Sequence, residues 1–303
     1  MQSVFDELYK NSLAKCEFKN LISIITAEEN IRLAYRNLKK NAGSRTPGTD
    51  GKTIADLAKM SEPELIGFVQ QKFNWYQPQS VRRKEIPKGN GKTRPLGIPT
   101  IMDRLIQQCV LQVMEPICEA KFCETSNGFR PNRGVENALA QAEKHMQKSN
   151  LHIVIDIDIK GFFDNVNHGK LLRQIWTMGI HDKKLLSIIS AMLKAEVAGI
   201  GFPEKGTPQG GILSPLLSNI VLNELDWWIT SQWVGMPTRH EYSGKIHENG
   251  TKDQSKKYRE LRKTNLKECY IVRYADDFKI FCRKHSDAVK LFEATRAWLK
   301  ERL

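Results

Sequence analysis

The chain has 303 residues, of which 40% are hydrophobic, and its 47 Lys and Arg against 34 Asp and Glu give a formal charge of +13. This length suffices for one large or two modest domains with cores of their own, and no apolar run approaches the roughly 20 residues of a membrane span. A membrane protein is therefore excluded. The basic balance predicts a polyanionic partner, foremost nucleic acid, although a basic protein that binds none is an open alternative.

The N-terminus and the cysteines both indicate a reducing, cytoplasmic environment. Residues 1–10 lack a basic stretch followed by an apolar one, so they do not predict a secretory signal. The six cysteines are scattered without a Cys-x-x-Cys pair or zinc-finger spacing. We expect reduced and mostly buried thiols.

The N-terminal region is predicted to be helical. Thr26-Ala27-Glu28-Glu29 has the spacing of a capping box, and apolar residues follow at helical period until Asn41. A loop rich in turn formers covers 44–51. A second capping box, Ser61-Glu62-Pro63-Glu64, then opens a helix that runs through Phe73.

Between residues 81 and 99 the pattern changes to two short strands. They are joined by Lys88-Gly89-Asn90-Gly91-Lys92, in which Asn-Gly is a strong hairpin signal. Because side chains alternate along a strand, Lys92 and Arg94 share one face if 93–98 is extended. That basic face is suited to a polyphosphate, but a solvated charged hairpin explains it equally well.

Two helices and a loop follow the hairpin. Residues 103–114 predict a helix whose apolar side lies in the core, with Pro116 just beyond its end. A loop at 127–134 carries two arginines and precedes a helix over about 135–148.

Three acids at strand ends are the main chemical signal of the sequence. In the strand 151–158 the apolar residues share one face, while Asp156 and Asp158 share the other. Asp276 and Asp277 lie between two apolar runs and predict the tip of a hairpin. An acidic hairpin tip has an ordinary explanation in turn geometry, but a third acid at another strand end favours a divalent metal site.

A glycine-rich loop and a basic insertion lie between these strands. Gly206-Thr207-Pro208-Gln209-Gly210-Gly211 precedes a helix that begins near Ser214, and such a loop lets the backbone approach a ligand closely. Residues 231–267 are polar, basic and without clear periodicity. We predict that they form an exposed insertion.

Six motifs occur in an order and spacing that identify a family. They are Ile86-Pro87-Lys88, Arg94-Pro95-Leu96-Gly97-Ile98-Pro99, Asn127-Gly128-Phe129-Arg130-Pro131, Asp158-Ile159-Lys160-Gly161-Phe162-Phe163-Asp164, Pro208-Gln209-Gly210-Gly211-Ile212-Leu213-Ser214-Pro215 and Tyr274-Ala275-Asp276-Asp277. Together they make the chain resemble, over essentially its whole length, the reverse transcriptase domain of group II intron-encoded proteins, the maturases.

The resemblance implies an α+β fold, the fingers and palm of a right-hand polymerase, with an antiparallel palm sheet backed by helices. It assigns 1–150 to an N-terminal extension and fingers with some palm helices. It assigns 151–303 to a palm that carries the basic insertion near 231–267. The chain is expected to stop before a thumb.

The resemblance also implies an RNA-directed DNA polymerase that uses two Mg²⁺ ions, for which Mn²⁺ could substitute. Two metal ions about 3.5–4 Å apart activate the primer 3′ oxygen and neutralise the leaving pyrophosphate. Asp158 and Asp276 would hold the ions, with Asp277 beside them. Asp156 is the rival of Asp158, which is preferred because the acid of the family directly precedes Ile-Lys-Gly-Phe-Phe.

Four residues are implied in nucleotide binding. Lys88 and Arg94 would cover the triphosphate as cationic contacts. Phe163 would pack under the sugar and exclude a 2′-hydroxyl; the alternative is an ordinary core residue, a role that suits Phe162 better. Gln209 would contact the nucleotide, or else satisfy the local backbone.

The implied partners are an RNA template with a DNA primer, dNTPs, and the group II intron RNA whose splicing the protein would assist. No membrane partner is expected. Basic N-terminal residues and the insertion 231–267 would hold RNA in a salt-sensitive manner. A homodimer is a further expectation, because a missing thumb would expose apolar surface. The expected location is the bacterial cytoplasm.

Three other interpretations stay open. One is an RNA-binding splicing cofactor without polymerase activity in this truncated form, since a chain without a thumb is expected to extend primers poorly. Another is a two-metal nuclease, against which the basic hairpin and the Gln209 loop favour a nucleoside triphosphate. The last is a retron-type reverse transcriptase or one from a diversity-generating element, which would share the acidic hairpin.

Overall fold

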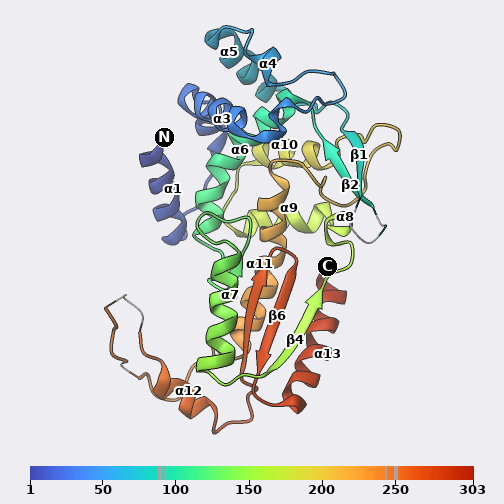
Figure 1. Cartoon of the computed structure of the whole chain (residues 1–303). Helices are drawn as coiled ribbons and strands as arrows, with labels where there is room; N and C mark the ends of the chain where they lie inside the picture. Colours follow the sequence, from blue (N-terminus) through green and yellow to red (C-terminus); the bar gives the residue numbers. More distant parts are fainter. Residues whose placement is uncertain (88–90, 92, 243, 249–251) are drawn as a thin grey trace. The chain divides into compact units, whose positions relative to one another are not determined.

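The computed structural model describes residues 1–87, 91, 93–242, 244–248 and 252–303, which form two compact units (Figure 1). The first unit consists of Met1–Phe122 and Gly161–Val221, and the second of Cys123–Lys160 and Leu222–Leu303. Each unit thus combines two separate stretches of chain. The assignment of fingers to 1–150 and palm to 151–303 follows different boundaries and stays a prediction.

The first unit is built around helix α6 (Ile101–Glu119), which contacts α1 (Gln2–Leu13), α2 (Leu21–Ile25) and α3 (Glu28–Lys40). The predicted apolar side of α6 is confirmed by complete burial of Leu105, Ile106, Cys109, Val110 and Val113. The predicted end before Pro116 is wrong, because the helix continues through it. Ile117 and Cys118 are fully buried, and their burial keeps the last turn helical although proline removes a backbone donor.

The two predicted capping boxes have different outcomes. Helix α3 begins at Glu28 with Ala27 at its N-cap, and Thr26, the C-cap of α2, instead donates its hydroxyl to the carbonyl of Ile22 within α2. The first box is therefore wrong, although the helix exists. The second is confirmed: the Glu64 carboxylate accepts from the Ser61 backbone N–H at 2.8 Å and caps α5 (Glu62–Asn74).

The remaining elements of the first unit include the predicted hairpin. Its strands β1 (Arg82–Pro87) and β2 (Thr93–Ile98) pair antiparallel, as expected. Lys88 and Lys92 lie outside the described residues. The short helices are η1 (Ala42–Arg45), α4 (Ile54–Leu57), α8 (Phe162–Asn165), α9 (His168–Thr177) and α10 (Lys183–Leu193).

The second unit contains a four-stranded sheet with the order β3-β5-β6-β4. Strands β4 (Ile153–Asp158), β5 (Cys269–Tyr274) and β6 (Asp277–Cys282) pair antiparallel, which confirms the predicted sheet. The short strand β3 (Ser126–Asn127) adds a parallel pair with β5, which the sequence did not predict.

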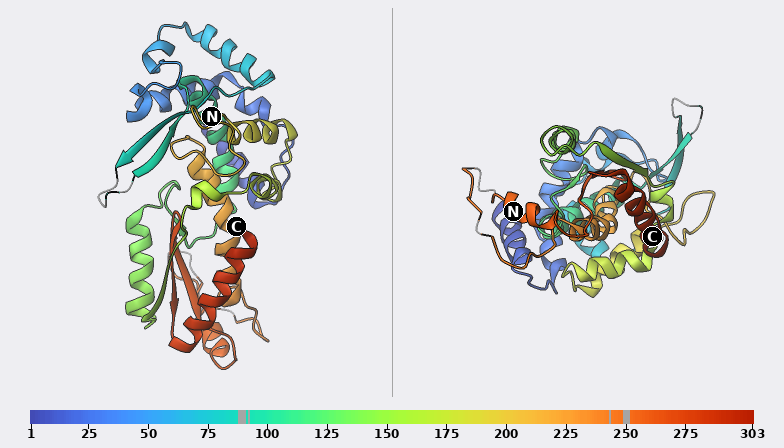
Figure 2. Two further views of the ribbon diagram at one scale, coloured as in Figure 1. Left: turned by 90° about the vertical axis from the view of Figure 1, so that its right-hand side faces the viewer. Right: turned by 90° about the horizontal axis from the view of Figure 1, so that it is seen from below.

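Helices cover both faces of this sheet (Figure 2). On one face, Leu151, Val272 and Phe281 form a core against Ala138 and Ala142 of α7 (Val135–Glu143), which continues as the π-helical turn η2 (Lys144–Lys148). On the other face, α13 (His285–Arg302) contacts β4 and β6. The α+β fold class is thus confirmed.

A buried ion pair joins the sheet to α11 (Ser214–Gln232), the helix predicted to begin near Ser214. The Arg273 guanidinium on β5 lies 2.7 Å from the Asp226 carboxylate, and both side chains are fully buried. Arg273 also donates to the Ser126 hydroxyl and to the Ala275 carbonyl, each at 2.6 Å. One side chain therefore ties β3, the β5–β6 turn and the helix together.

The described part of the segment 231–267 is less exposed than predicted. It contains α12 (Ser255–Leu261), and Trp233 and Leu261 are buried. The Trp233 indole donates to the Tyr270 hydroxyl at 3.0 Å and stacks on Tyr258. The prediction of an exposed insertion is therefore wrong for Trp233 and Leu261, and the contact with Tyr270 places Trp233 against strand β5.

Two compositional expectations can be compared with the structure. All six cysteines are free, and five are buried while Cys16 is exposed, which agrees with the predicted thiols. Among the helices in the described part of the chain, none combines the length and apolar character needed to span a bilayer.

Candidate active site

The three predicted acids lie at one end of the sheet in the second unit. Asp158, the last residue of β4, is directly opposite Asp277, the first residue of β6. Opposite residues of an antiparallel pair point to the same face with Cβ atoms about 5 Å apart, so these two carboxylates share a face. Asp276 is next to them in the two-residue turn between β5 and β6.

The acidic turn has a fixed and strained backbone. Ala275 has a φ of 55°, a left-handed conformation that an L-residue adopts at a cost of about 1–2 kcal/mol. Its N–H donates to the Asn127 carbonyl at 3.0 Å. A Cβ atom on Gly128 would lie 3.0 Å from the Ala275 nitrogen, so the loop at 127–134 touches the turn with no room for a side chain.

A lysine distinguishes the rival acids. The Lys279 ammonium lies 2.7 Å from an Asp156 oxygen and 3.3 Å from an Asp277 oxygen, and the hydrogen bond to Asp156 raises the pKa of Lys279. Asp156 is thus engaged with a cation of the protein. No ion pair of this kind joins Asp158 or Asp276 to another of the residues with a described position, which leaves their oxygens for another cation.

The fit of these acids to a metal ion rests on donor chemistry. Carboxylate oxygens are the ligands that Mg²⁺ prefers, and at this end of the sheet Asp158 and Asp277 are exposed while Asp276 is half-buried. Within the described ranges, however, no group of three or more His, Cys, Asp or Glu side chains is arranged to hold a metal ion. The donor types fit Mg²⁺, and Lys279 is the competitor for Asp277.

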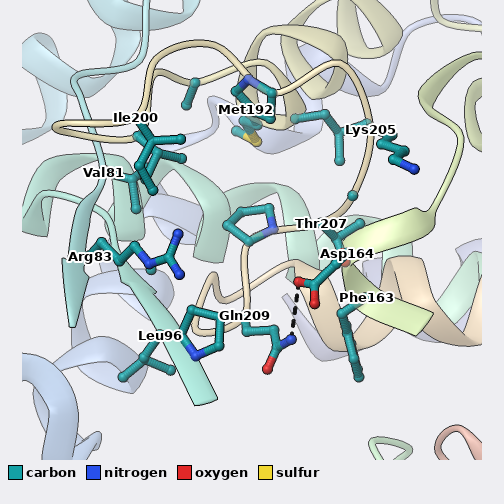
Figure 3. Close-up of a pocket in the computed structure, with 18 residues that line it drawn as sticks. Val81, Arg83, Leu96, Phe163, Asp164, Met192, Ile200, Lys205, Thr207 and Gln209 are labelled. Carbon is teal, nitrogen blue, oxygen red and sulfur yellow. Dashed lines mark hydrogen bonds between the residues drawn. The ribbon is translucent and has the colours of Figure 1, made fainter. Parts of the chain in front are cut away.

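A separate cavity of about 410 Å³ lies within the first unit (Figure 3). It is lined by Phe163 and Asp164 of α8, by Leu96 of β2 and by Gln209 of the glycine-rich loop. The Gln209 amide donates to the Asp164 carboxylate at 3.3 Å. Two of the predicted nucleotide-binding residues, Phe163 and Gln209, are thus neighbours of one cavity.

The adjacent phenylalanines of α8 differ in burial. Phe162 is only 4% exposed and belongs to the core, as predicted, whereas Phe163 is half-buried and lines the cavity. The Phe163 carbonyl accepts from the Thr207 N–H at 2.7 Å. A Cβ atom on Gly206 would lie 3.0 Å from that carbonyl, so glycine allows the loop to approach α8. The sequence predicted that this loop lets the backbone approach a ligand; at Gly206 the loop approaches the backbone of α8.

The other nucleotide-binding predictions are less completely placed. Arg94 is exposed on β2 opposite Ile86, and strand alternation puts it on the same face as the cavity-lining Leu96. Lys88 lies outside the described residues.

The sequence missed three charged residues of the cavity, Arg83, Asp164 and Lys205. Asp164 is the last residue of the motif at 158–164, and Arg83 belongs to the basic run Arg82-Arg83-Lys84. The sequence therefore contained a signal for both residues, although no role was assigned to them.

An α+β unit with carboxylates gathered at one end of its sheet is the architecture expected of a polymerase palm. Residues 86–302 match the family model for reverse transcriptase (RNA-dependent DNA polymerase). The chain therefore belongs to the reverse transcriptase family. Its predicted enzyme class, an RNA-directed DNA polymerase, is the class of that family.

The chain is similar to several curated proteins. Protein YkfC of Escherichia coli (strain K12) is 34% identical over 88% of this chain and 71% of its own length. The group II intron-encoded protein LtrA of Lactococcus lactis subsp. cremoris is 38% identical over 75% of this chain and 38% of its own. Nuclear intron maturase 4, mitochondrial, of Arabidopsis thaliana is 25% identical over 75% of this chain and 27% of its own. The predicted resemblance to intron-encoded proteins is confirmed, and the chain spans well under half of LtrA.

Proposed function

We propose that this chain carries the catalytic centre of an RNA-directed DNA polymerase, which extends a DNA primer on an RNA template with dNTPs. The observation that supports this most directly is the register of β4 and β6. It sets Asp158 opposite Asp277, beside the turn that holds Asp276. Membership of the reverse transcriptase family supplies the reaction class, which favours a polymerase over a nuclease.

The proposed roles of the acids follow from their surroundings. Asp158 and Asp276 would hold two Mg²⁺ ions, with Asp277 beside them, and Mn²⁺ would be accepted by the same oxygens. Bound there, the ions would activate the primer 3′ oxygen and neutralise the pyrophosphate. Lys279 would keep Asp156 away from the ions and hold Asp277 in place through its second contact.

The proposed nucleotide contacts come from the first unit. Phe163 would exclude a 2′-hydroxyl from the sugar, and Gln209, oriented by Asp164, would contact the nucleotide. Arg94 would meet the triphosphate, as would Lys88 on the hairpin tip. The division into fingers at 1–150 and palm at 151–303 belongs to the same proposal.

The proposed RNA partners rest on charge and on the named relatives. LtrA and the plant maturase are intron proteins by name, so we propose group II intron RNA and assistance of splicing for this chain also. The formal charge of +13 supports RNA binding of this kind. We expect the activity inside a bacterial cell, where its substrates occur. The predicted homodimer is a separate expectation, and light scattering measures the mass that tests it.

Primer extension on an RNA template, with and without Mg²⁺ and with dNTPs or rNTPs, tests the proposal. Asp276→Ala and Asp158→Asn are expected to lower the rate at least about hundredfold, the scale of removing a transition-state stabiliser. Asp156→Asn is the matched control on the same strand face and should keep extension within a few-fold.

One outcome would contradict the assigned acids and another the polymerase itself. Equal losses for Asp156→Asn and Asp158→Asn would remove the assignment of the metal-binding acid. Absence of DNA product from the unmodified chain, with salt-sensitive intron RNA binding intact, would favour the splicing cofactor.

A further inference from the structure

Phe129 is an exposed aromatic residue in a strained backbone conformation. Its φ is 57°, in the left-handed region that bulky residues rarely adopt, and it is 48% exposed. Asn132 in the same loop has a similar φ of 58°, but asparagine tolerates this region. Burial in the core therefore does not explain why a phenylalanine occupies position 129.

Hydrogen bonds of the residues on both sides of Phe129 hold the loop in this conformation. The Arg130 guanidinium, 9% exposed, donates to the carbonyls of Cys123 and Ser126, both at 2.7 Å. The Gly128 N–H donates to the Arg133 carbonyl at 2.9 Å. Strained backbone that is held by surrounding hydrogen bonds is typical of functional sites. In such sites the strained residue presents its side chain in a fixed position.

The loop lies against the acidic turn within the second unit. Strand β3 pairs Asn127 with Tyr274, and the Ala275 N–H donates to the Asn127 carbonyl at 3.0 Å. Gly128 comes so close to Ala275 that a Cβ atom would lie 3.0 Å from its nitrogen. Phe129 therefore follows directly after the residue that touches the turn of Asp276.

The strand order puts Phe129 and Asp158 on opposite sides of that turn. The order is β3-β5-β6-β4, so the loop after β3 flanks the turn on one side and the end of β4 on the other. Neighbouring strands are about 4.8 Å apart, so the three intervals from β3 to β4 span about 14 Å. If the acids hold the end of the primer, the template strand paired with it would lie toward one of the two sides of the acidic turn.

We propose that Phe129 is a stacking platform for a template base next to the primer terminus. This inference rests on the proposed polymerase function, which it extends to the template strand. Unpaired bases stack on aromatic side chains, and because every base has such a face the contact tolerates any sequence. Because the loop is already held in place, it does not have to become ordered when a template base binds to the ring of Phe129.

Removing the ring separates this role from a structural one. Phe129→Asn suits the left-handed backbone, so its melting temperature should equal or exceed that of the unmodified chain. Its affinity for a primer–template should fall about tenfold, the scale of one lost stacking contact, while the KM for dNTPs changes little. Phe129→Tyr keeps the ring and should retain affinity. Leu139→Ala removes another exposed apolar side chain, on α7, and should have no effect.

Photocrosslinking gives a readout that does not depend on polymerisation. A template with 5-iodouracil at the first unpaired positions is bound to the Asp276→Ala variant, and the crosslinked peptide is identified by mass spectrometry. A crosslink at Phe129 is expected. Unchanged primer–template affinity in Phe129→Asn, or a lower melting temperature as its sole effect, would overturn the proposal.

The same experiments keep the two proposals distinguishable. DNA synthesis by the unmodified chain together with unchanged affinity in Phe129→Asn would reject the stacking platform and leave the polymerase standing. A crosslink at Phe129 in the Asp276→Ala variant, together with no DNA synthesis by the unmodified chain, would support the template contact and reject the polymerase.

Discussion

At the scale of single residues, the difference between neighbours decides the chemistry. Asp156 and Asp158 share a strand face, yet Asp156 lies 2.7 Å from the Lys279 ammonium, whereas Asp158 is opposite Asp277. Phe162 and Phe163 are adjacent, but only Phe163 lines a cavity. In both pairs the sequence offered two residues of the same type, and long-range contacts gave them different surroundings.

Phe163 provides a prediction at this scale. Phe163→Ala should raise the kcat/KM for rNTPs relative to dNTPs about tenfold or more, because a bulky side chain that rejects a 2′-hydroxyl would be gone. Steady-state incorporation of single dNTPs and rNTPs measures the ratio. Phe163→Tyr is the control that preserves the ring and the discrimination. An unchanged ratio in Phe163→Ala would make Phe163 a packing residue of the cavity.

At the scale of elements, one carboxylate connects helix α12 to the sheet. Glu268 is 5% exposed and hydrogen-bonds to Arg262, just after α12, and to Arg283, just after β6. Burial raises the pKa of Glu268, but the hydrogen bonds and charges of the two arginines outweigh it and hold the pKa below its ordinary value. The charged form is therefore the one that stabilises the fold.

The pH dependence of this connection follows from the direction of the shift. An acid with a lowered pKa in the folded state contributes stability above its unfolded pKa, about 4.3 for glutamate, and loses it as the pH falls through the folded value. Thermal unfolding between pH 7 and pH 3 should show a smaller acid-induced drop for Glu268→Gln than for the unmodified chain. Glu260→Gln, whose carboxylate pairs with Lys263 at the surface, is the matched control. Parallel curves for all three proteins would contradict the assignment.

The buried pair of Arg273 and Asp226 gives a second prediction at the element scale. Arg273→Met leaves the Asp226 carboxylate buried without its partner, which should destabilise the protein by about 3–5 kcal/mol. Urea unfolding measures the loss. Arg32→Met, at an exposed ion pair with Glu62, should cost less than about 1 kcal/mol. Similar losses for both variants would show that the buried pair does not hold the sheet to α11.

At the scale of the whole molecule, the charge of +13 determines how the protein should respond to salt. Binding of RNA releases counterions, so log K is expected to fall linearly with log salt concentration. Lys256 and Arg259 are exposed on α12, and replacing both with alanine should reduce the slope by about two if each neutralises a phosphate. Lys59→Ala, which lies in an ion pair with Asp56, is the control. Filter binding of intron RNA at several salt concentrations measures the slopes; equal slopes would place the RNA elsewhere.

Local patterns in the sequence determined much of this protein. The hairpin at 81–99, the strand that ends at Asp158, the acidic turn and the apolar side of α6 were predicted correctly, because strand alternation, helical period and turn chemistry act between near neighbours in the chain. The family, and with it the reaction class, was carried by motifs that the sequence contains in full.

Only the tertiary structure decided the features that depend on residues far apart in the chain. Helix α6 continues through Pro116 because the burial of Ile117 and Cys118 outweighs the local preference of proline. Trp233 is buried because it meets Tyr270, 37 residues away, and Gln209 is oriented by Asp164, 45 residues away. The parallel pairing of β3, which sets the loop of Phe129 beside Asp276, is likewise a long-range contact. Free energy gained from such contacts has no signature in a local stretch of sequence.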